Sequence, residues 1–174
     1  MPNIFFASDH HLGHKNILTF LNQDGTKLRD FAHVDEMNEF IVEKHNSVVG
    51  PKDKTYFLGD VVMNKNYFHL LSRMNGEKVL IKGNHDIHKI DYYLQFFKDV
   101  RGFHQFDGFA ISHIPIHPES LARWGHNIHG HLHNNVVKNM YGVPDSRYFN
   151  VSMERIGYVP ISLEQIKAVT KKLT

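Results

Sequence analysis

Five short apolar runs, each ending in a cluster of polar side chains, constrain this chain more than any other feature of its sequence. The runs span residues 3–8, 55–59, 78–82, 108–112 and 126–130. Their length and their content of β-branched and aromatic residues favour buried strands. Helical patterns separate several of them, so we expect a layered α/β domain in which the ends of the strands carry the functional loops.

The segments between the runs predict helices at residues 33–47, 66–74 and 163–173. The first is the clearest, because Val34, Met37 and Ile41 recur at three- and four-residue steps. Four aromatic residues form two i,i+4 pairs, which we assign to the buried face of a helix rather than to a base-stacking surface: Tyr92, Tyr93, Phe96 and Phe97. Residues 134–147 predict a loop and residues 148–153 a strand.

Composition excludes several classes of protein and of site. Residues 1–174 fit a single domain, and no apolar stretch approaches the ~18 residues of a membrane span. The first residues lack the apolar core of a signal peptide, so we expect a cytoplasmic protein without a membrane partner. Cysteine is absent, so a metal site here must use nitrogen and oxygen ligands.

Histidine is unusually abundant, with 15 residues in 174. Most of them gather in segments 10–14, 85–88, 113–117 and 126–133. Such clustering is the first indication of metal chemistry. The formal net charge of +2 comes from interspersed charges and does not by itself predict nucleic-acid binding.

The polar clusters supply metal-ligand residue types at short spacings. Asp9 and His11 follow the first run with one residue between them, so alternation in an extended chain would project both to one side. Asp60 closes the second run behind Gly59, which gives the backbone room to present a carboxylate that bridges two cations. A Gly-Asp pair alone is most often an ordinary turn.

The remaining clusters lie after the third, fourth and fifth runs. The third run ends in an amide, an imidazole and a carboxylate in succession, Asn84, His85 and Asp86. His113 ends the fourth run, and a His-x-His pair at residues 131 and 133 follows the fifth. Two imidazoles aligned along a strand suit a metal ion, whereas an isolated histidine is usually a hydrogen-bonded structural group.

Taken in order, the motifs Asp-x-His, Gly-Asp, Gly-Asn-His-Asp, His and Gly-His-x-His resemble the full motif set of the calcineurin-like metallophosphoesterases. Segments 8–17 and 149–152 look like a small bacterial and phage-associated branch of that family, and the resemblance covers nearly the whole chain. It implies a two-sheet αββα sandwich, with the metals at the ends of the central strands.

The resemblance also implies the ligand sets of two metal ions. One ion would be held by Asp9, His11, Asp60 and His133, and the other by Asp60, Asn84, His113 and His131, so that Asp60 bridges them. Imidazole and carboxylate ligands with one amide favour transition metals over Mg²⁺ or Ca²⁺. We expect two divalent ions, with Mn²⁺ first and Fe, Zn²⁺ or Ni²⁺ as alternatives.

The activity implied is hydrolysis of phosphodiesters by in-line attack of a metal-bridging hydroxide. His85 resembles the family's non-ligand histidine, which stabilises the transition state or protonates the leaving oxygen, and Asp86 would orient it. His14 and Arg29 are the candidates for contact with the substrate phosphate, and an exposed arginine without such a role is the alternative for Arg29. The expected partner is a phosphoester, with a nucleotide or nucleic acid among the candidates, and no obligate protein partner is evident.

Three alternatives remain open at this stage. The first is that the same site hydrolyses phosphomonoesters instead of phosphodiesters. A metal-supported interaction module that has lost catalysis is disfavoured, because every expected ligand and His85 are present. A nucleic-acid-binding protein without chemistry is disfavoured because no basic stripe or aromatic groove motif is visible.

Overall fold

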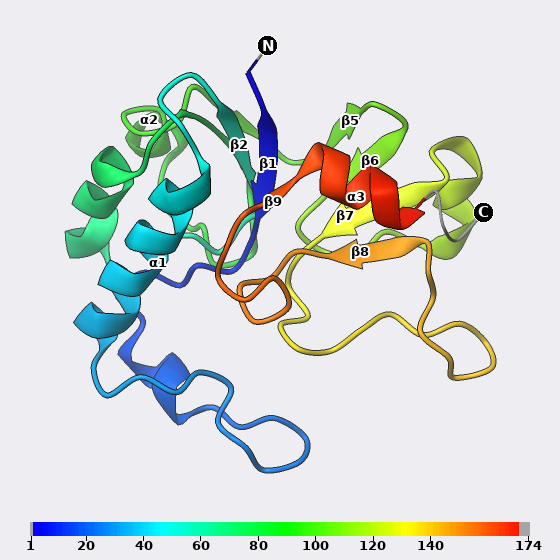
Figure 1. Ribbon diagram of the computed structural model, residues 1–174, viewed down its shortest axis with the longest axis horizontal. Coiled ribbons are helices and arrows are strands. Elements are labelled where there is room, and N and C mark those ends of the chain that lie inside the picture. Colours follow the sequence, from blue (N-terminus) through cyan, green and yellow to red (C-terminus); the bar gives the residue numbers. More distant parts are fainter. Residues whose placement is uncertain (1, 171–174) are drawn as a thin grey trace.

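A computed structural model describes residues 2–170 and contains two β-sheets with helices beside them (Figure 1). The first sheet has the strand order β4 (Asp99–Arg101), β3 (Glu77–Ile81), β2 (Lys54–Phe57), β1 (Ile4–Ala7) and β9 (Ile161–Ser162). The second has the order β5 (His104–Phe106), β6 (Phe109–Ile111), β7 (His126–His129) and β8 (Tyr148–Asn150). The predicted α/β class is therefore confirmed.

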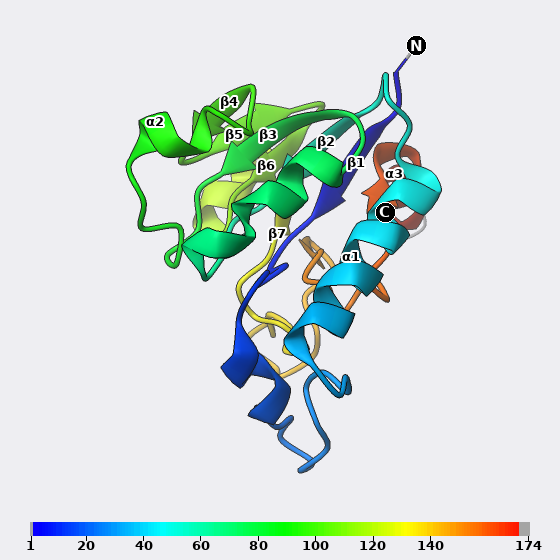
Figure 2. The ribbon, with the colours of Figure 1, turned by 90° about the vertical axis from the view of Figure 1, so that its left-hand side faces the viewer.

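The helical elements gather mainly on one side of the first sheet. The α-helices are α1 (Val34–Val48), α2 (Ile90–Tyr93) and α3 (Leu163–Thr170), and the 3-10 helices are η1 (Lys15–Thr19), η2 (Lys65–Arg73) and η3 (Pro118–Arg123). Figure 2 shows α1 and η2 on the face of this sheet that is turned away from the second sheet. They pack there on Ala7, Phe57 and Leu80, which form one buried core cluster with them.

The opposite face of the first sheet packs on the second sheet. Because side chains alternate along a strand, Phe6 and Ile81 point to this side while their neighbours point to the helices. Ile111 and Ile128 of the second sheet belong to the same buried cluster. The face-to-face contact of the two sheets thus makes a second apolar core, to which α3 contributes Leu163 and Ile166 at the β9 edge.

Parallel pairing brings the functional loops to one end of the molecule. β1, β2 and β3 pair in parallel, as do β6, β7 and β8, so their carboxyl ends lie together within each sheet. A parallel bridge between Ser8 and Ser152 joins the two ends, with Ser8 N donating to Val151 O at 2.9 Å. The polar clusters of both sheets therefore meet at one place.

Several element predictions need correction. The segment predicted at 66–74 forms the 3-10 helix η2, which buries Phe68, Leu70 and Leu71. The aromatic residues 92–97 are buried or half-buried in the first core as predicted, but α2 spans only part of them. The strand predicted at 148–153 ends at Asn150, and the end of the helix predicted at 163–173 lies outside the described residues.

None of the helices described within residues 2–170 has the length and apolar character needed to cross a membrane.

Candidate metal centre

Six side chains from four loops form two groups of potential metal ligands at the shared end of the sheets. Each residue offers one ligand atom, and within each group these atoms lie within 4.8 Å of one another. The first group is Asp9, His11 and His133, and the second is Asp60, His113 and His131. Each group falls within one of the two ligand sets implied by the resemblance, which also placed Asp60 in both sets and added Asn84 to the second.

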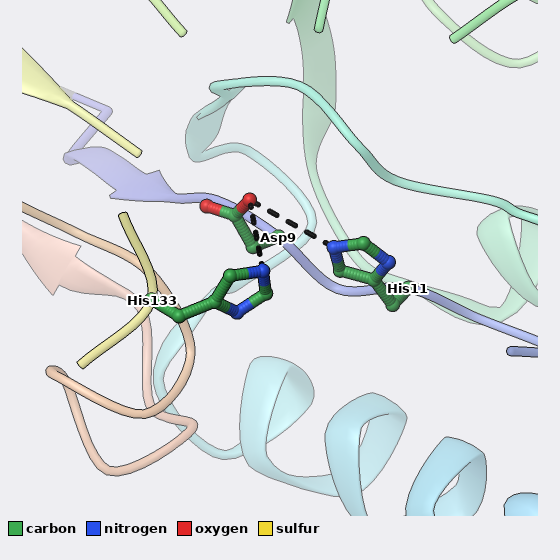
Figure 3. A group of neighbouring side chains, drawn as sticks. All are labelled: Asp9, His11 and His133. Atoms are coloured by element: carbon green, nitrogen blue, oxygen red, sulfur yellow. Dashed lines mark ion pairs between the residues drawn. The ribbon is translucent and has the colours of Figure 1, made fainter. Parts of the chain in front are cut away.

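The first group encloses a position that suits a cation. Figure 3 shows the carboxylate of Asp9 facing the imidazoles of His11 and His133. Asp9 Oδ1 lies 3.8 Å from His11 Nε2 and 4.0 Å from His133 Nε2, too far for hydrogen bonds. Asp9 Oδ1 and His11 Nε2 are also buried without any hydrogen-bond partner. Because an ion binds such atoms at roughly 2.0–2.2 Å, ligand atoms about 3–4 Å apart fit around one.

The second group adjoins the first through Asp60. Asp60 Oδ2 lies 3.3 Å from His113 Nε2 and 4.0 Å from His11 Nε2, so one oxygen is close to both groups. Asn84 Oδ1 lies 2.9 Å from His113 Nε2, which adds the predicted amide to this side. His113 Nδ1 donates to Leu58 O at 2.6 Å, and this bond turns Nε2 toward the site. Both groups therefore fit divalent ions that share a carboxylate.

Burial and neighbouring charges shift the pKa values of these ligands in opposite directions. Burial raises the pKa of Asp9, but the imidazoles of His11, His113 and His133 hold it well below its ordinary range. Burial lowers the pKa of His113, but the carboxylates of Asp60 and Asp9 outweigh it and raise the pKa above its usual value. The carboxylate of Asp9 is thus ionised, and a metal ion at His113 would compete with a proton for the same nitrogen.

The backbone at the ligands differs from the extended chain that the sequence suggested. Strands β1 and β7 end at Ala7 and His129, before the ligand pairs begin. Five ligands then adopt positive φ angles, namely Asp9 (58°), His11 (52°), Asp60 (52°), His131 (69°) and His133 (49°). Such left-handed conformations are uncommon and cost free energy for residues other than glycine. Their concentration here is itself a mark of a functional site.

Hydrogen bonds and close packing hold these turns. Asp9 Oδ2 accepts from His131 N at 2.8 Å and from Ser152 Oγ at 2.9 Å, so the loops after β1, β7 and β8 are tied together. A Cβ on Gly59 would lie 2.6 Å from the Cα of Gly83. Only glycine allows the loops after β2 and β3 to approach this closely.

Asp86 has a different place from the one predicted. Its carboxylate is buried and accepts hydrogen bonds from the backbone N–H groups of Asp60 (2.8 Å), Val61 (3.2 Å) and Gly83 (2.8 Å). It therefore fixes the loop that carries Asp60 rather than the ring of His85. His85 is exposed, and its backbone N–H donates to Asp60 Oδ1 at 2.8 Å. Its imidazole lies 6.0 Å from that of His11, between ring centroids.

The position of Arg29 contradicts its predicted contact with the substrate phosphate. Its side chain is only 1% exposed, because it is enclosed by the centre's own loops. Nε donates to Glu154 Oε1 at 2.7 Å, Nη1 donates to His10 O at 2.9 Å, and Nη2 donates to Asp9 O. Arg29 thus fastens the Asp9 turn from behind and cannot reach a substrate.

Glu154 is a functional candidate that the sequence did not reveal. Its Oε1 accepts from His133 Nδ1 at 3.0 Å as well as from Arg29. A carboxylate on the far nitrogen fixes the ring and increases the basicity of the nitrogen that binds metal. Burial lowers the pKa of His133, but Glu154 more than offsets this and raises it. The only local hint was the position of Glu154 two residues beyond the segment 149–152.

His14 lies beside His11 at the mouth of the centre. The two rings stack with centroids 5.3 Å apart, and their Nδ1 atoms are 3.2 Å apart. Burial, followed by the charge of His11, lowers the pKa of His14 to about 4, so it is neutral at pH 7. It orients the His11 ring, and its predicted contact with substrate phosphate stays a prediction.

Replacing Glu154 by glutamine should weaken metal binding about 10- to 100-fold, the usual effect of mutating the carboxylate partner of a metal-binding histidine. Glutamine keeps an acceptor for His133 but removes the charge that balances Arg29. Mn²⁺ titration by calorimetry measures the change. Glu39→Gln is the matched control, because Glu39 forms an exposed pair with Arg73 outside the centre. Equal Mn²⁺ affinities of the Glu154 variant and the wild type would show that Glu154 does not support metal binding.

The chain has relatives and a structural neighbour, but it matches no model of a known protein family. It is 36% identical over 179 residues to the uncharacterized protein MJ1445 of Methanocaldococcus jannaschii, covering 99% of this chain and 93% of that protein. The gene 66 protein of Mycobacterium phage L5 is 36% identical over 92 residues, 49% of this chain and 41% of its own length.

A solved structure shares the fold. The protein of unknown function AQ665 from Aquifex aeolicus superposes with a TM-score of 0.73 at 24% identity, over 97% of this chain and 100% of that one. At this identity the likeness concerns the fold alone. The chemistry of the site must therefore be argued from its own residues.

Proposed function

This chain belongs to the same family as the uncharacterized protein MJ1445, and from its metal centre we propose that it is a metal-dependent phosphoesterase of the calcineurin-like type. The observation that carries the proposal is the position of Asp60 Oδ2, which lies 4.0 Å from a nitrogen of one ligand group and 3.3 Å from a nitrogen of the other. A carboxylate between two groups of N and O ligands is the arrangement that a bridged pair of ions needs. The two sheets that share a core also fit the αββα sandwich of the calcineurin-like metallophosphoesterases.

The residues divide into two ligand sets. Asp9, His11, Asp60 and His133 would hold one ion, and Asp60, Asn84, His113 and His131 the other. When bound, two such ions neutralise the charge of a phosphoryl group and lower the pKa of a bound water. Imidazole and carboxylate ligands with one amide suit transition metals, and we propose Mn²⁺ first, with Fe, Zn²⁺ or Ni²⁺ as alternatives.

The chain's own side chains then supply orientation and proton transfer. His85 is exposed beside Asn84, where it can donate a hydrogen bond to a phosphoryl oxygen or a proton to the leaving oxygen. Its backbone is fixed by Asp60, so metal binding and the position of His85 are coupled. His14, stacked on His11, lies where it can contact the phosphate.

We favour phosphodiesters as substrates, with monoesters as the alternative for the same residues. A non-catalytic metal-binding module is the weaker candidate, because the site retains an accessible histidine that no ligand role requires. The ligand set does not separate the two ester classes, so a substrate panel is the direct test.

The purified protein should bind about two divalent ions per chain and hydrolyse bis-p-nitrophenyl phosphate in the presence of Mn²⁺. Elemental analysis after metal loading and dialysis measures the ions. A panel that adds p-nitrophenyl phosphate and cyclic nucleotides measures the ester preference. Two bound ions without hydrolysis of any ester would support the binding module, and no bound transition metal would refute the centre altogether.

A further inference from the structure

A pocket opens directly beside the metal centre. It has a volume of about 410 Å³ and lies between the loop 20–28, which follows η1, and the segment 131–135. His131 and His133 line it as well as belonging to the two ligand groups. A group attached to a phosphate at the centre therefore has this pocket within reach.

The wall formed by the first loop is apolar and open to solvent. Phe20 is 46% exposed and Leu21 64% exposed, although both are large hydrophobic residues. The Phe20 ring meets His14 edge to face, with centroids 5.7 Å apart, and His14 in turn stacks on His11. A row of rings thus leads from the metal centre to the partly exposed side chain of Phe20.

The loop that carries Phe20 is held in place without a ligand. Asn134 Nδ2 donates to Asn22 Oδ1 at 2.8 Å, which fastens the loop to the opposite wall of the pocket. Asn22 Nδ2 donates to Thr26 Oγ1 at 3.0 Å, and Leu28 N donates to Phe20 O at 2.8 Å. In Figure 1 this loop projects from the body of the molecule below α1. The pocket is therefore largely formed in advance, which reduces the cost of binding.

Away from the two histidines the pocket carries no charged side chain and offers amide groups. Gln23 and Asn135 each present a donor and an acceptor. An apolar wall together with amide edges suits a neutral planar heterocycle, because stacking is indifferent to the identity of a base while amides pair with its polar edge.

We propose that this pocket binds a nucleobase, so that the substrate is a nucleoside phosphoester whose base stacks on Phe20 while its phosphate lies at the metal centre. This inference rests on the proposed phosphoesterase function. Phe20 is a specificity residue in this view, because it contacts the part of the substrate that does not react. The pocket adds affinity for the base and leaves the metal ligands unchanged.

Calorimetry of the Mn²⁺-loaded protein with thymidine 5′-phosphate and with methyl phosphate tests the proposal. The wild type should bind the nucleotide at least about 5-fold more tightly than methyl phosphate, the lower end of what one stacked base contributes. Phe20→Leu keeps an apolar side chain but removes the ring, and should abolish this preference. Phe20→Tyr keeps the ring and should retain it.

The controls separate this proposal from the function on which it rests. Phe103→Ala truncates another exposed phenylalanine (41% exposed), between β4 and β5, and should leave both affinities unchanged. Metal content should equal that of the wild type in every variant. Equal binding of nucleotide and methyl phosphate by a wild type that hydrolyses phosphoesters would overturn the pocket proposal alone. A nucleotide preference that survives Phe20→Leu would also overturn it.

Discussion

Replacing Asp60 by asparagine is expected to weaken both metal positions together and to reduce hydrolysis to background. Asp60 Oδ2 lies within 4.0 Å of imidazole nitrogens of both ligand groups. A neutral amide cannot supply the negative charge that two cations share. Because losing an outer-shell partner already costs about 10- to 100-fold in metal affinity, losing the shared ligand should cost more than about 100-fold.

The asparagine variant should still fold, which keeps the experiment interpretable. Its side-chain oxygen can accept the hydrogen bond from His85 N that Asp60 Oδ1 accepts now, and asparagine tolerates the positive φ of 52°. Asp107→Asn is a matched control, because Asp107 has a φ of 51° and is paired with Lys167 outside the centre. Elemental analysis and turnover of bis-p-nitrophenyl phosphate are measured on both. Full metal occupancy with normal turnover in the Asp60 variant would show that no shared carboxylate is needed.

The central strands of this fold were predictable from the sequence because their signal is local. The five apolar runs correspond to β1, β2, β3, β6 and β7, each within one or two residues at its ends. These strands are buried, so their side chains must be apolar over several positions in succession. β4 and β9 were not predicted, because they are short and only partly buried at the edges of the first sheet, where little apolar pattern is required.

The metal ligands were predictable as residues but not as a geometry. Their types at strand ends indicated metal chemistry, and the resemblance of their order to a known motif set implied the division into two groups. The left-handed turns at Asp9 and His131 were not predictable, because they depend on hydrogen bonds between distant loops. Periodicity describes a strand and carries no information about the residue that follows its end.

The support behind the ligands was the least predictable part. Arg29 and Glu154 lie 125 positions apart in the chain, yet they form a buried ion pair behind the centre. Taken alone, an arginine in a loop suggests a phosphate contact, since exposed arginines bind phosphate well. Here the side chain of Arg29 is buried and cannot contact a phosphate. Its burial depends on how distant parts of the chain pack, which no local sequence pattern shows. Removing one member of such a pair is costly because the other charge stays unpaired.

His85→Ala should slow hydrolysis substantially while leaving both ions bound. His85 is exposed beside Asn84 and belongs to neither ligand group, and its ring centroid lies 6.0 Å from that of His11. Its backbone N–H, which holds Asp60, remains in the alanine variant. General acid catalysis typically contributes about 10²- to 10⁴-fold, so a loss of kcat in this range is expected for esters with poor leaving groups.

The leaving group distinguishes the two roles that His85 can have. An alkoxide leaves poorly without a proton, whereas p-nitrophenolate departs readily as an anion, so a proton donor matters far more for an alkyl-leaving diester. We therefore expect His85→Ala to lose much more kcat with the alkyl-leaving diester than with the nitrophenyl-leaving one. Equal losses would favour a hydrogen bond to the phosphoryl oxygen in the transition state. His69→Ala, an exposed histidine in η2, serves as the control, and loss of metal in the His85 variant would make His85 a ligand, contrary to the proposal.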